Sequence, residues 1–489
     1  MKTLMTNDIQ KPASLTRHDS DDASDRSVDV NRREFMARSA MLGVAAAAGL
    51  AVAPQGAAAR SGPVRTGASG FAPLEVNSPM ARWKLPQPVD WVNGAHSRFS
   101  FPNWQSGNDD SVYYNLNIPE FFPTRVVRPD EEFSVLERDI QADLLNLTFT
   151  DHEGNTTQTL SEYLVGRRQV QAMLMAHQGK IVFEVYPGMN PLDMHVWMSA
   201  SKTTAGLLVS MLADEGAVDL DQPLSSYVEE LQGSAWDDIT VKNTMNMATA
   251  LNNEETFENL VNPDSWIANW FSAVFGVGDV TPTQWREMMA SVEKLDSEGP
   301  GELFRYSTAN TQALVMLTEA VTGLPWQAFW HERVWSKIGA RNPLIVGLTP
   351  DGMPVGGGLI NTTAEDMIRY ALLYTPSWNV VSTENVVPQR MLDLIYGMGD
   401  PAAYTASTER IYGTQWFGEV PFKNTAQWDH AFEDGAMFKH GNMGQGIYVD
   451  PGRDFCGMTF ALASNDTSVA GIDHSPGYLR AAAKAIAGG

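Results

Sequence analysis

The first pattern in the chain that could carry out chemistry is formed by a serine and a lysine. Ser199 and Lys202 stand three residues apart at the expected start of a helix, and side chains at this spacing lie on one face. The lysine amine can therefore lie beside the serine hydroxyl. Because a lysine acts as a base only without its proton, burial or nearby positive charge must lower its reference pKa of about 10.4. The spacing predicts a serine nucleophile that is activated by a lysine base.

The same spacing occurs a second time, at Ser291 and Lys294. Ser291 lies in a charged stretch that is typical of a solvated helix face, whereas Ser199 follows Trp197-Met198 and precedes an apolar helix. The competing hypothesis for Ser199 is a serine that only caps the helix, with a surface lysine after it. The sequence contains neither a Gly-x-Ser-x-Gly elbow nor a His-Glu-x-x-His zinc helix.

Two further segments could complete such a site. Tyr306 precedes an apolar helix over 313–321, where a tyrosine is more often a core residue with a hydrogen-bonded hydroxyl. The segment Lys439-His440-Gly441-Asn442 leads into a glycine-rich strand, although a lone histidine at a strand start is usually structural. A glycine-dense strand edge lets a substrate backbone approach closely, and its N–H groups can hold an oxyanion.

The elements that must position these residues are predicted from hydrophobic periodicity and turn residues. A helix is expected over 199–213, and mostly helical segments fill the stretch from about 224 to 339. An Ala-rich helix over 478–486 ends the chain. We expect strands over 173–176, 181–186, 446–449 and 455–462. Strands from both ends of the chain with helices between them indicate one sheet with a helical insertion.

Composition limits the possible classes of function. Lys and Arg number 34 against 58 Asp and Glu, which gives a formal net charge of −24. Such a charge repels phosphate backbones and anionic lipid headgroups, so we expect no nucleic-acid partner. We expect no stable membrane anchor, because no segment after the N-terminal region is long and apolar enough. Cys456 is the only cysteine, which rules out an intrachain disulfide and a cysteine-based metal site. We expect neither a metal nor a cofactor.

The N-terminal residues have the features of an export signal. Arg32-Arg33 precede Phe35 and an uncharged run over 41–53, which is too short to span a bilayer comfortably and is followed by Ala57-Ala58-Ala59. This order predicts a bacterial twin-arginine signal region over 1–59 and a periplasmic or secreted protein. The export machinery would then be a partner during secretion. The alternative is an ordinary amphipathic helix.

The chain is expected to have four parts. The signal region over 1–59 is followed by an N-terminal extension over 60–165 that is rich in Pro, Asn and aromatic residues and packs on the main body. An α/β sheet domain comprises 166–223 and 345–489. A helical domain over 224–344 is inserted between its two pieces.

From Gln169 to Ile486 the chain resembles the β-lactamase-like serine hydrolases, which include class C β-lactamases, D-Ala-D-Ala peptidases, family VIII esterases and 6-aminohexanoate-dimer hydrolases. The resemblance is carried by stretches in family order, at 197–202, 213–216, 220–223, 304–310, 356–366 and 444–451. It implies a β-lactamase/transpeptidase-like α/β (α+β) fold, with an antiparallel sheet flanked by helices and an inserted, mainly helical domain. It also implies that Ser199 is the nucleophile and that Lys202 and Tyr306 handle its proton.

Two motifs depart from the family pattern. The family's Tyr-x-Asn, whose Asn helps to hold a substrate amide, is Tyr306-Ser307-Thr308 here. This form is most similar to that of the 6-aminohexanoate-dimer hydrolases. The family's Lys-Thr-Gly corresponds to Lys439-His440-Gly441, which makes the N–H of Asn442 the second oxyanion donor and lets Lys439 and His440 influence a substrate carboxylate. A register led by His440 lacks the glycine required at Asn442.

These observations predict a hydrolase that cleaves amide or ester bonds of small substrates through a Ser199 acyl-enzyme, as 6-aminohexanoate-dimer hydrolases do. Within that chemistry, the alternatives are a family VIII-type esterase, a β-lactamase or a D-Ala-D-Ala peptidase. The alternative from another class is a penicillin- or peptidoglycan-binding protein that is acylated but barely turns over.

Overall fold

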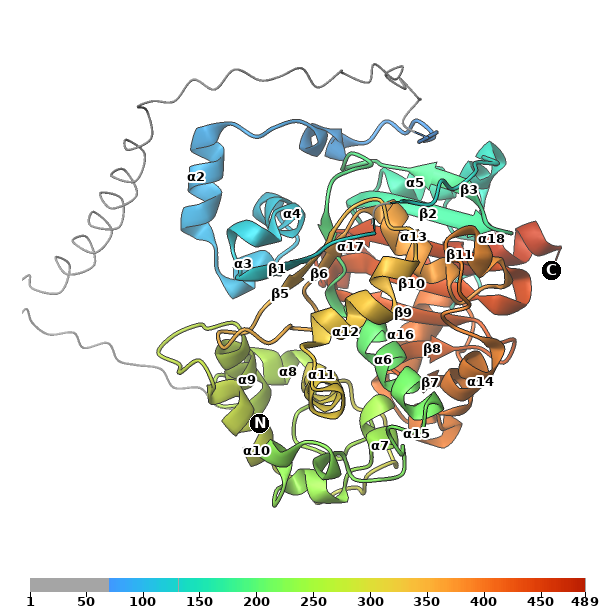
Figure 1. Ribbon diagram of the computed structural model, residues 1–489. Helices are drawn as coiled ribbons and strands as arrows, with labels where there is room; N and C mark the ends of the chain where they lie inside the picture. The colour runs from blue at the N-terminus through green and yellow to red at the C-terminus, as the bar shows by residue number, and fades with distance from the viewer. Residues whose placement is uncertain (1–69, 131, 489) are drawn as a thin grey trace, which may run out of the picture. The chain divides into compact units, whose positions relative to one another are not determined.

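The computed structural model describes residues 70–130 and 132–488, so the expected signal region over 1–59 lies outside the described residues. The larger of its two sheets has seven antiparallel strands in the order β3-β2-β11-β10-β9-β8-β7 (Figure 1). These strands are β2 Val170–His177, β3 Lys180–Val185, β7 Lys423–Thr425, β8 Trp428–Ala431, β9 Met437–Gly441, β10 Gln445–Asp450 and β11 Phe455–Ala461. The four strands expected from the sequence are β2, β3, β10 and β11.

Side chains alternate between the two faces of this sheet and divide the core into two clusters. Along β10, Ile447 and Val449 belong to the larger apolar cluster, whereas Tyr448 belongs to the smaller one. Residues of α13 Ala364–Leu372 pack in the larger cluster, and those of α18 Ser475–Ala487 pack in the smaller one. Helices therefore cover both faces of the sheet, and a strand buried on both faces needs no polar side.

The helical segments lie before, between and after the strands of this sheet. The α-helices not yet given bounds are α2 Val89–Arg98, α3 Phe101–Trp104, α4 Asp109–Leu116, α5 Leu160–Leu164, α6 Lys202–Asp214, α7 Val241–Met245, α8 Phe257–Val261, α9 Trp266–Val274, α10 Gln284–Ser291, α11 Thr308–Thr322, α12 Trp326–Arg333, α14 Gln389–Gly397, α15 Pro401–Thr405, α16 Thr408–Phe417 and α17 Thr467–Ala470. Helices α7 to α12 fall in the stretch for which helices were expected. In the described part of the chain, no helix combines the length and apolar character that a membrane crossing needs.

A second sheet corrects the expectation of a single one. It has four strands in the order β1-β5-β6-β4, and all its pairs are antiparallel. Its strands are β1 Thr124–Val127, β4 His195–Val196, β5 Leu344–Gly347 and β6 Ile360–Thr362. Each has only two to four residues, too few for a periodicity that the sequence could reveal. Because β1 comes from the N-terminal extension, that segment is part of the folded body.

Buried ion pairs fix the extension to the sheet domain. Arg138 pairs with Glu184 of β3 at 3.2 Å and with Glu365 of α13. Glu365 also accepts a bond from Arg369 at 2.5 Å, and Arg369 pairs with Asp366 at 2.9 Å. The side chains of Glu184, Glu365, Asp366 and Arg369 are at most 4% exposed. A charge left alone at such depth is strongly unfavourable, so each member depends on the others.

Replacing Arg138 by Ala should therefore destabilise the protein by about 3–5 kcal/mol, the usual cost of removing one partner from a buried pair. Urea unfolding followed by circular dichroism measures this change. The matched control is Arg82→Ala, because Arg82 forms an exposed pair with Asp109 and exposed pairs contribute little. Equal unfolding midpoints for the two variants would contradict the conclusion that the buried ion pairs of Arg138 stabilise the fold.

Candidate active site

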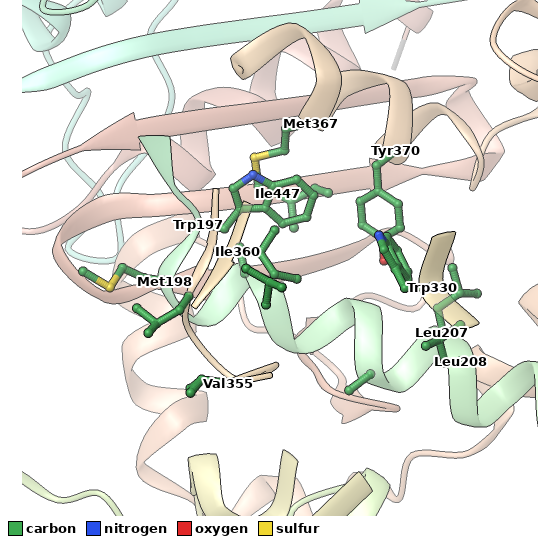
Figure 2. Close-up of a cluster of buried hydrophobic side chains, with 14 of the residues drawn as sticks. Trp197, Met198, Leu207, Leu208, Trp330, Val355, Ile360, Met367, Tyr370 and Ile447 are labelled. Carbon is green, nitrogen blue, oxygen red and sulfur yellow. The ribbon is translucent and has the colours of Figure 1, made fainter. Parts of the chain in front are cut away.

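Ser199 lies in a tight turn that joins β4 to α6. The turn is a 3-10 helix over Met198–Ser201, which continues directly into α6. Trp197 anchors it, because its backbone N–H donates to Ile360 O at 2.7 Å and its indole N–H donates to Thr362 Oγ1 at 2.7 Å. Figure 2 shows Trp197 and Met198 among the buried apolar side chains around Ile360. The start of the turn is thus bonded to β6.

Met198 has a backbone conformation that costs energy at this turn. Its φ angle is 47°, in the left-handed region that disfavours side chains with a Cβ by about 1–2 kcal/mol. The side chain is only 4% exposed, so its packing offsets the strain. The N–H of Ser199 follows at the start of the helical segment, where backbone donors have no acceptor within the helix. Such strained turns cluster at functional sites.

Lys202 is fully buried, and its amine is surrounded by three oxygen acceptors. Nζ donates to Ser199 Oγ at 2.9 Å, to Thr308 Oγ1 at 2.9 Å and to Gly357 O at 2.7 Å. These acceptors come from three separate segments of the chain. At Gly357, a Cβ atom would lie 2.5 Å from the Thr308 methyl group, so a glycine is required for this carbonyl to reach the amine.

The same burial changes the protonation of Lys202. Desolvation lowers its pKa from 10.5 to about 7, and the charge of Lys439 acts in the same direction. The carboxylates of Glu255 and Asp429 oppose this shift. A lysine with this pKa is partly neutral at physiological pH, which allows it to accept a proton from the adjacent serine hydroxyl.

Tyr306 lies near the Ser199 hydroxyl. That hydroxyl is close enough to the phenol to lower the pKa of Tyr306 slightly, and Lys439 Nζ donates a hydrogen bond to the phenol oxygen at 3.4 Å. Burial first, and then the charges of Asp429 and Glu255, hold the pKa of Tyr306 well above its usual value. The hydroxyl therefore keeps its proton at neutral pH and can donate it or pass it on, but it does not act as a standing phenolate.

Thr308 and Glu255 hold the lysine side of the cluster. Thr308 occupies the position where the resemblance expects an Asn, and its hydroxyl is bonded to Lys202. Its backbone N–H, the first of α11, donates to the carboxylate of Glu255. The N–H of Glu255 in turn donates to Tyr306 O at 2.9 Å. The Thr308 hydroxyl thus supports the lysine in this structure.

Lys439 carries the second positive charge and has a dedicated counter-ion. Its side chain on β9 is fully buried and pairs with Asp429 of β8. The other carboxylate oxygen of Asp429 accepts the backbone N–H of His440 at 3.1 Å. The ammonium group also lies 4.5 Å from the centre of the Tyr306 ring. Asp429 therefore keeps a charged lysine next to the tyrosine hydroxyl.

Gly441 brings β9 against the turn that bears Ser199. A Cβ atom on Gly441 would lie 2.5 Å from Trp197 O and 3.2 Å from Met198 Cβ. Only a glycine permits this approach, and it places the next residue, Asn442, beside the turn. Asn442 opens a short 3-10 helix over Asn442–Gly444, so its N–H has no acceptor within that helix.

His440 points to the opposite face of β9 from Lys439, as strand alternation requires. Its ring stacks on Trp416 with centroids 4.3 Å apart, and its Nε2 lies 3.4 Å from Asp473 Oδ2. The side chain is 20% exposed. Of the third-motif residues in the described structure, Lys439 contacts Tyr306, whereas His440 is directed elsewhere.

Five of the residues singled out in the sequence lie in one cluster of contacts, namely Ser199, Lys202, Tyr306, Thr308 and Lys439. Gly441 and Asn442 adjoin it through the backbone. Sequence reasoning missed Glu255 and Asp429, because each is an isolated acidic residue outside any motif. The second Ser-x-x-Lys pattern is a surface feature, since Ser291 is exposed at the end of α10 and Lys294 pairs with Asp238.

The pH dependence of activity should reveal the balance of charge around Lys202. Activity should rise with pH through about 7, because only neutral Lys202 accepts the serine proton and its pKa is about 7. Glu255 raises that pKa, so Glu255→Gln should move the rising limb to lower pH. Profiles of kcat against pH measure the shift. Glu258→Gln is the control, because Glu258 is an exposed neighbour of Glu255. An equal shift of the rising limb in Glu258→Gln would show that the effect is not specific to Glu255.

Comparisons with known proteins show the family and the fold of the chain. The family described as Beta-lactamase matches residues 157–484. A 6-aminohexanoate-dimer hydrolase of Paenarthrobacter ureafaciens is 26% identical over 377 residues, which cover 74% of this chain and 85% of the relative. A solved structure from Bacillus anthracis, described as a 6-aminohexanoate-dimer hydrolase, has a TM-score of 0.62 at 19% identity and covers 78% of this chain and 96% of its own.

The solved structure shows the fold, and the family match spans both the turn of Ser199 and the third motif. The expectation of an antiparallel, β-lactamase/transpeptidase-like α/β fold is thereby confirmed. The chain belongs to the beta-lactamase family, and it is a serine hydrolase.

Proposed function

We propose that the protein hydrolyses amide or ester bonds of small substrates through a covalent acyl-enzyme on Ser199. The observation that carries this proposal is the fully buried Lys202 amine at 2.9 Å from Ser199 Oγ, with a pKa lowered to about 7 by burial. A nucleophile next to a base of matched pKa is the arrangement that covalent catalysis needs.

In the acylation step, neutral Lys202 accepts the Ser199 proton while Oγ bonds to the substrate carbonyl carbon. The N–H groups of Ser199 and Asn442 hold the resulting oxyanion. Tyr306 donates its proton to the leaving amine or alcohol as the carbonyl–leaving-group bond breaks, and the proton on Lys202 replaces it. In the second step water attacks the ester, its proton passes to the Tyr306–Lys202 pair, and Ser199 Oγ is reprotonated as it leaves.

For the substrate, we favour a short linear amide. The relative from Paenarthrobacter ureafaciens is named for the hydrolysis of a 6-aminohexanoate dimer. The motif Tyr306-Ser307-Thr308 supports this choice over a β-lactam. Where a side-chain amide is expected for β-lactam recognition, Thr308 offers a hydroxyl that is bonded to Lys202. Family VIII-type ester hydrolysis uses the same groups, and it remains the alternative within this chemistry.

A fluorophosphonate probe tests the nucleophile directly, because Ser199 Oγ forms a bond to phosphorus as fluoride leaves. Ser199→Ala should abolish labelling, and Lys202→Ala should slow it by a factor on the order of 10² or more, the usual contribution of a general base. Ser291→Ala is the matched control, since Ser291 has the same spacing to a lysine. Full labelling of Ser199→Ala would reassign the nucleophile.

A turnover panel then separates the substrate classes. The panel comprises p-nitrophenyl acetate and butyrate, a linear aminohexanoate dimer, nitrocefin and a D-Ala-D-Ala peptide. We expect Ser199-dependent turnover of the amide or the esters and no hydrolysis of nitrocefin. Rapid nitrocefin hydrolysis would favour a β-lactamase. Stoichiometric acylation without turnover would favour a penicillin- or peptidoglycan-binding protein.

We also propose that the chain is exported to the periplasm or beyond by the twin-arginine route, on the strength of Arg32-Arg33 and the uncharged run that follows. The double substitution Arg32→Lys and Arg33→Lys keeps the charge but removes the paired arginines. In a bacterial host it should leave a full-length precursor in the cytoplasm, detected by fractionation and immunoblotting. Arg26→Lys is the control, and equal export of both variants would contradict this route.

A further inference from the structure

The N-terminal extension reaches the third motif through one side chain. Asn442 Nδ2 donates a hydrogen bond to Gln105 Oε1, across 337 positions of the sequence. Asn442 is the residue whose backbone N–H is placed beside the Ser199 turn by Gly441. A residue of the extension is thus in direct contact with the proposed oxyanion donor.

Gln105 is presented by a rigid turn between α3 and α4. The Ser111 hydroxyl accepts the N–H of Gly107 at 3.0 Å and donates to Asn103 O at 2.9 Å, so it closes the turn. The carbonyl of Gly107 accepts a bond from Gln169 Nε2 at 2.9 Å. Gly107 has a φ of 74°, and a Cβ there would lie 2.4 Å from Ser464 N. The turn is therefore wedged against the segment that follows β11.

Aromatic packing anchors the same turn on its other side. The ring of Trp104, which precedes Gln105, lies 5.0 Å from Phe122 and 6.0 Å from Phe275 at the end of α9. Phe101 lies 5.3 Å from Phe275. Trp104 is 2% exposed. The packing of these large rings restricts the backbone of the turn, so the Cα atom of Gln105, from which its side chain extends, has a fixed position.

The remaining polar groups of Asn442 are also engaged, with one exception. Its Oδ1 accepts the N–H of Met443 at 3.0 Å, and its carbonyl accepts Gln445 Nε2 at 2.9 Å. Together with the bond to Gln105, these contacts use every polar group of Asn442 except its backbone N–H. Met443 has a φ of 66°, so this backbone path is strained and depends on such bonds.

We propose that Gln105 is a positioning residue for the oxyanion hole. It fixes Asn442 so that the backbone N–H points to the substrate oxygen, and it makes the N-terminal extension a component of the active site. This inference rests on the proposed acyl-enzyme function. A donor that acts on the transition state changes kcat while KM stays nearly constant.

The test compares Gln105→Met, which preserves side-chain length but removes the acceptor, with the full-length wild type. The rate of Ser199 phosphonylation by the fluorophosphonate and the kcat for p-nitrophenyl butyrate should each fall roughly tenfold, less than the 10²–10³-fold that follows loss of a whole oxyanion donor. KM should not change. Gln87→Met is the control, because Gln87 lies in the same extension and bonds only to the nearby carbonyls of Arg82 and Leu85.

Asn442→Ala breaks the same bond from its other end and serves as a second variant if Gln105→Met does not fold. Because both substitutions act through one contact, Gln105→Met should have no further effect in the Asn442→Ala background. An unchanged rate in Gln105→Met, or the same fold-loss with and without the Asn442 side chain, would overturn the inference. A wild type without Ser199-dependent labelling would instead refute the proposed function itself.

Discussion

The removal of the Lys202 amine from water is the constraint around which the rest of the site is arranged. An ammonium group buried this deeply loses its hydration, which lowers its pKa to about 7 and makes it a base. Three oxygens must then replace the lost water, and they come from Ser199, Thr308 and Gly357. The turn of Ser199, the start of α11 at Thr308 and the loop of Gly357 therefore have to meet at the Lys202 amine. This requirement explains both the strained φ of Met198 and the glycine at 357.

The charges near this amine are balanced in pairs. Lys439 lowers the pKa of Lys202 further, whereas Glu255 and the Lys439 partner Asp429 raise it. Buried ion pairs rarely add stability over apolar residues of the same size. The Lys439–Asp429 pair therefore has its clearest physical role in holding a positive charge beside the Tyr306 hydroxyl, which stays protonated in this environment.

The N-terminal extension contacts the rest of the protein in three ways. It supplies β1 to the smaller sheet, it places Arg138 in a buried ionic network, and it contacts Asn442 through Gln105. Each contact joins segments more than 40 positions apart in the sequence. Such contacts fix the extension relative to the catalytic turn, because the carboxylates and the apolar surface that they cover would otherwise be left unpaired or exposed.

The sequence by itself determined the nucleophile pattern, four of the seven strands of the larger sheet, and the family. Ser199 and Lys202 are close because helix geometry alone makes residues three apart neighbours, and β2, β3, β10 and β11 have enough residues for their apolar character to be visible. The tertiary structure decided which residues complete the site. Glu255, Asp429 and Gln105 lie outside any motif, and His440 is turned away by strand alternation. Contacts of this kind depend on how distant segments pack, and no local pattern records that packing.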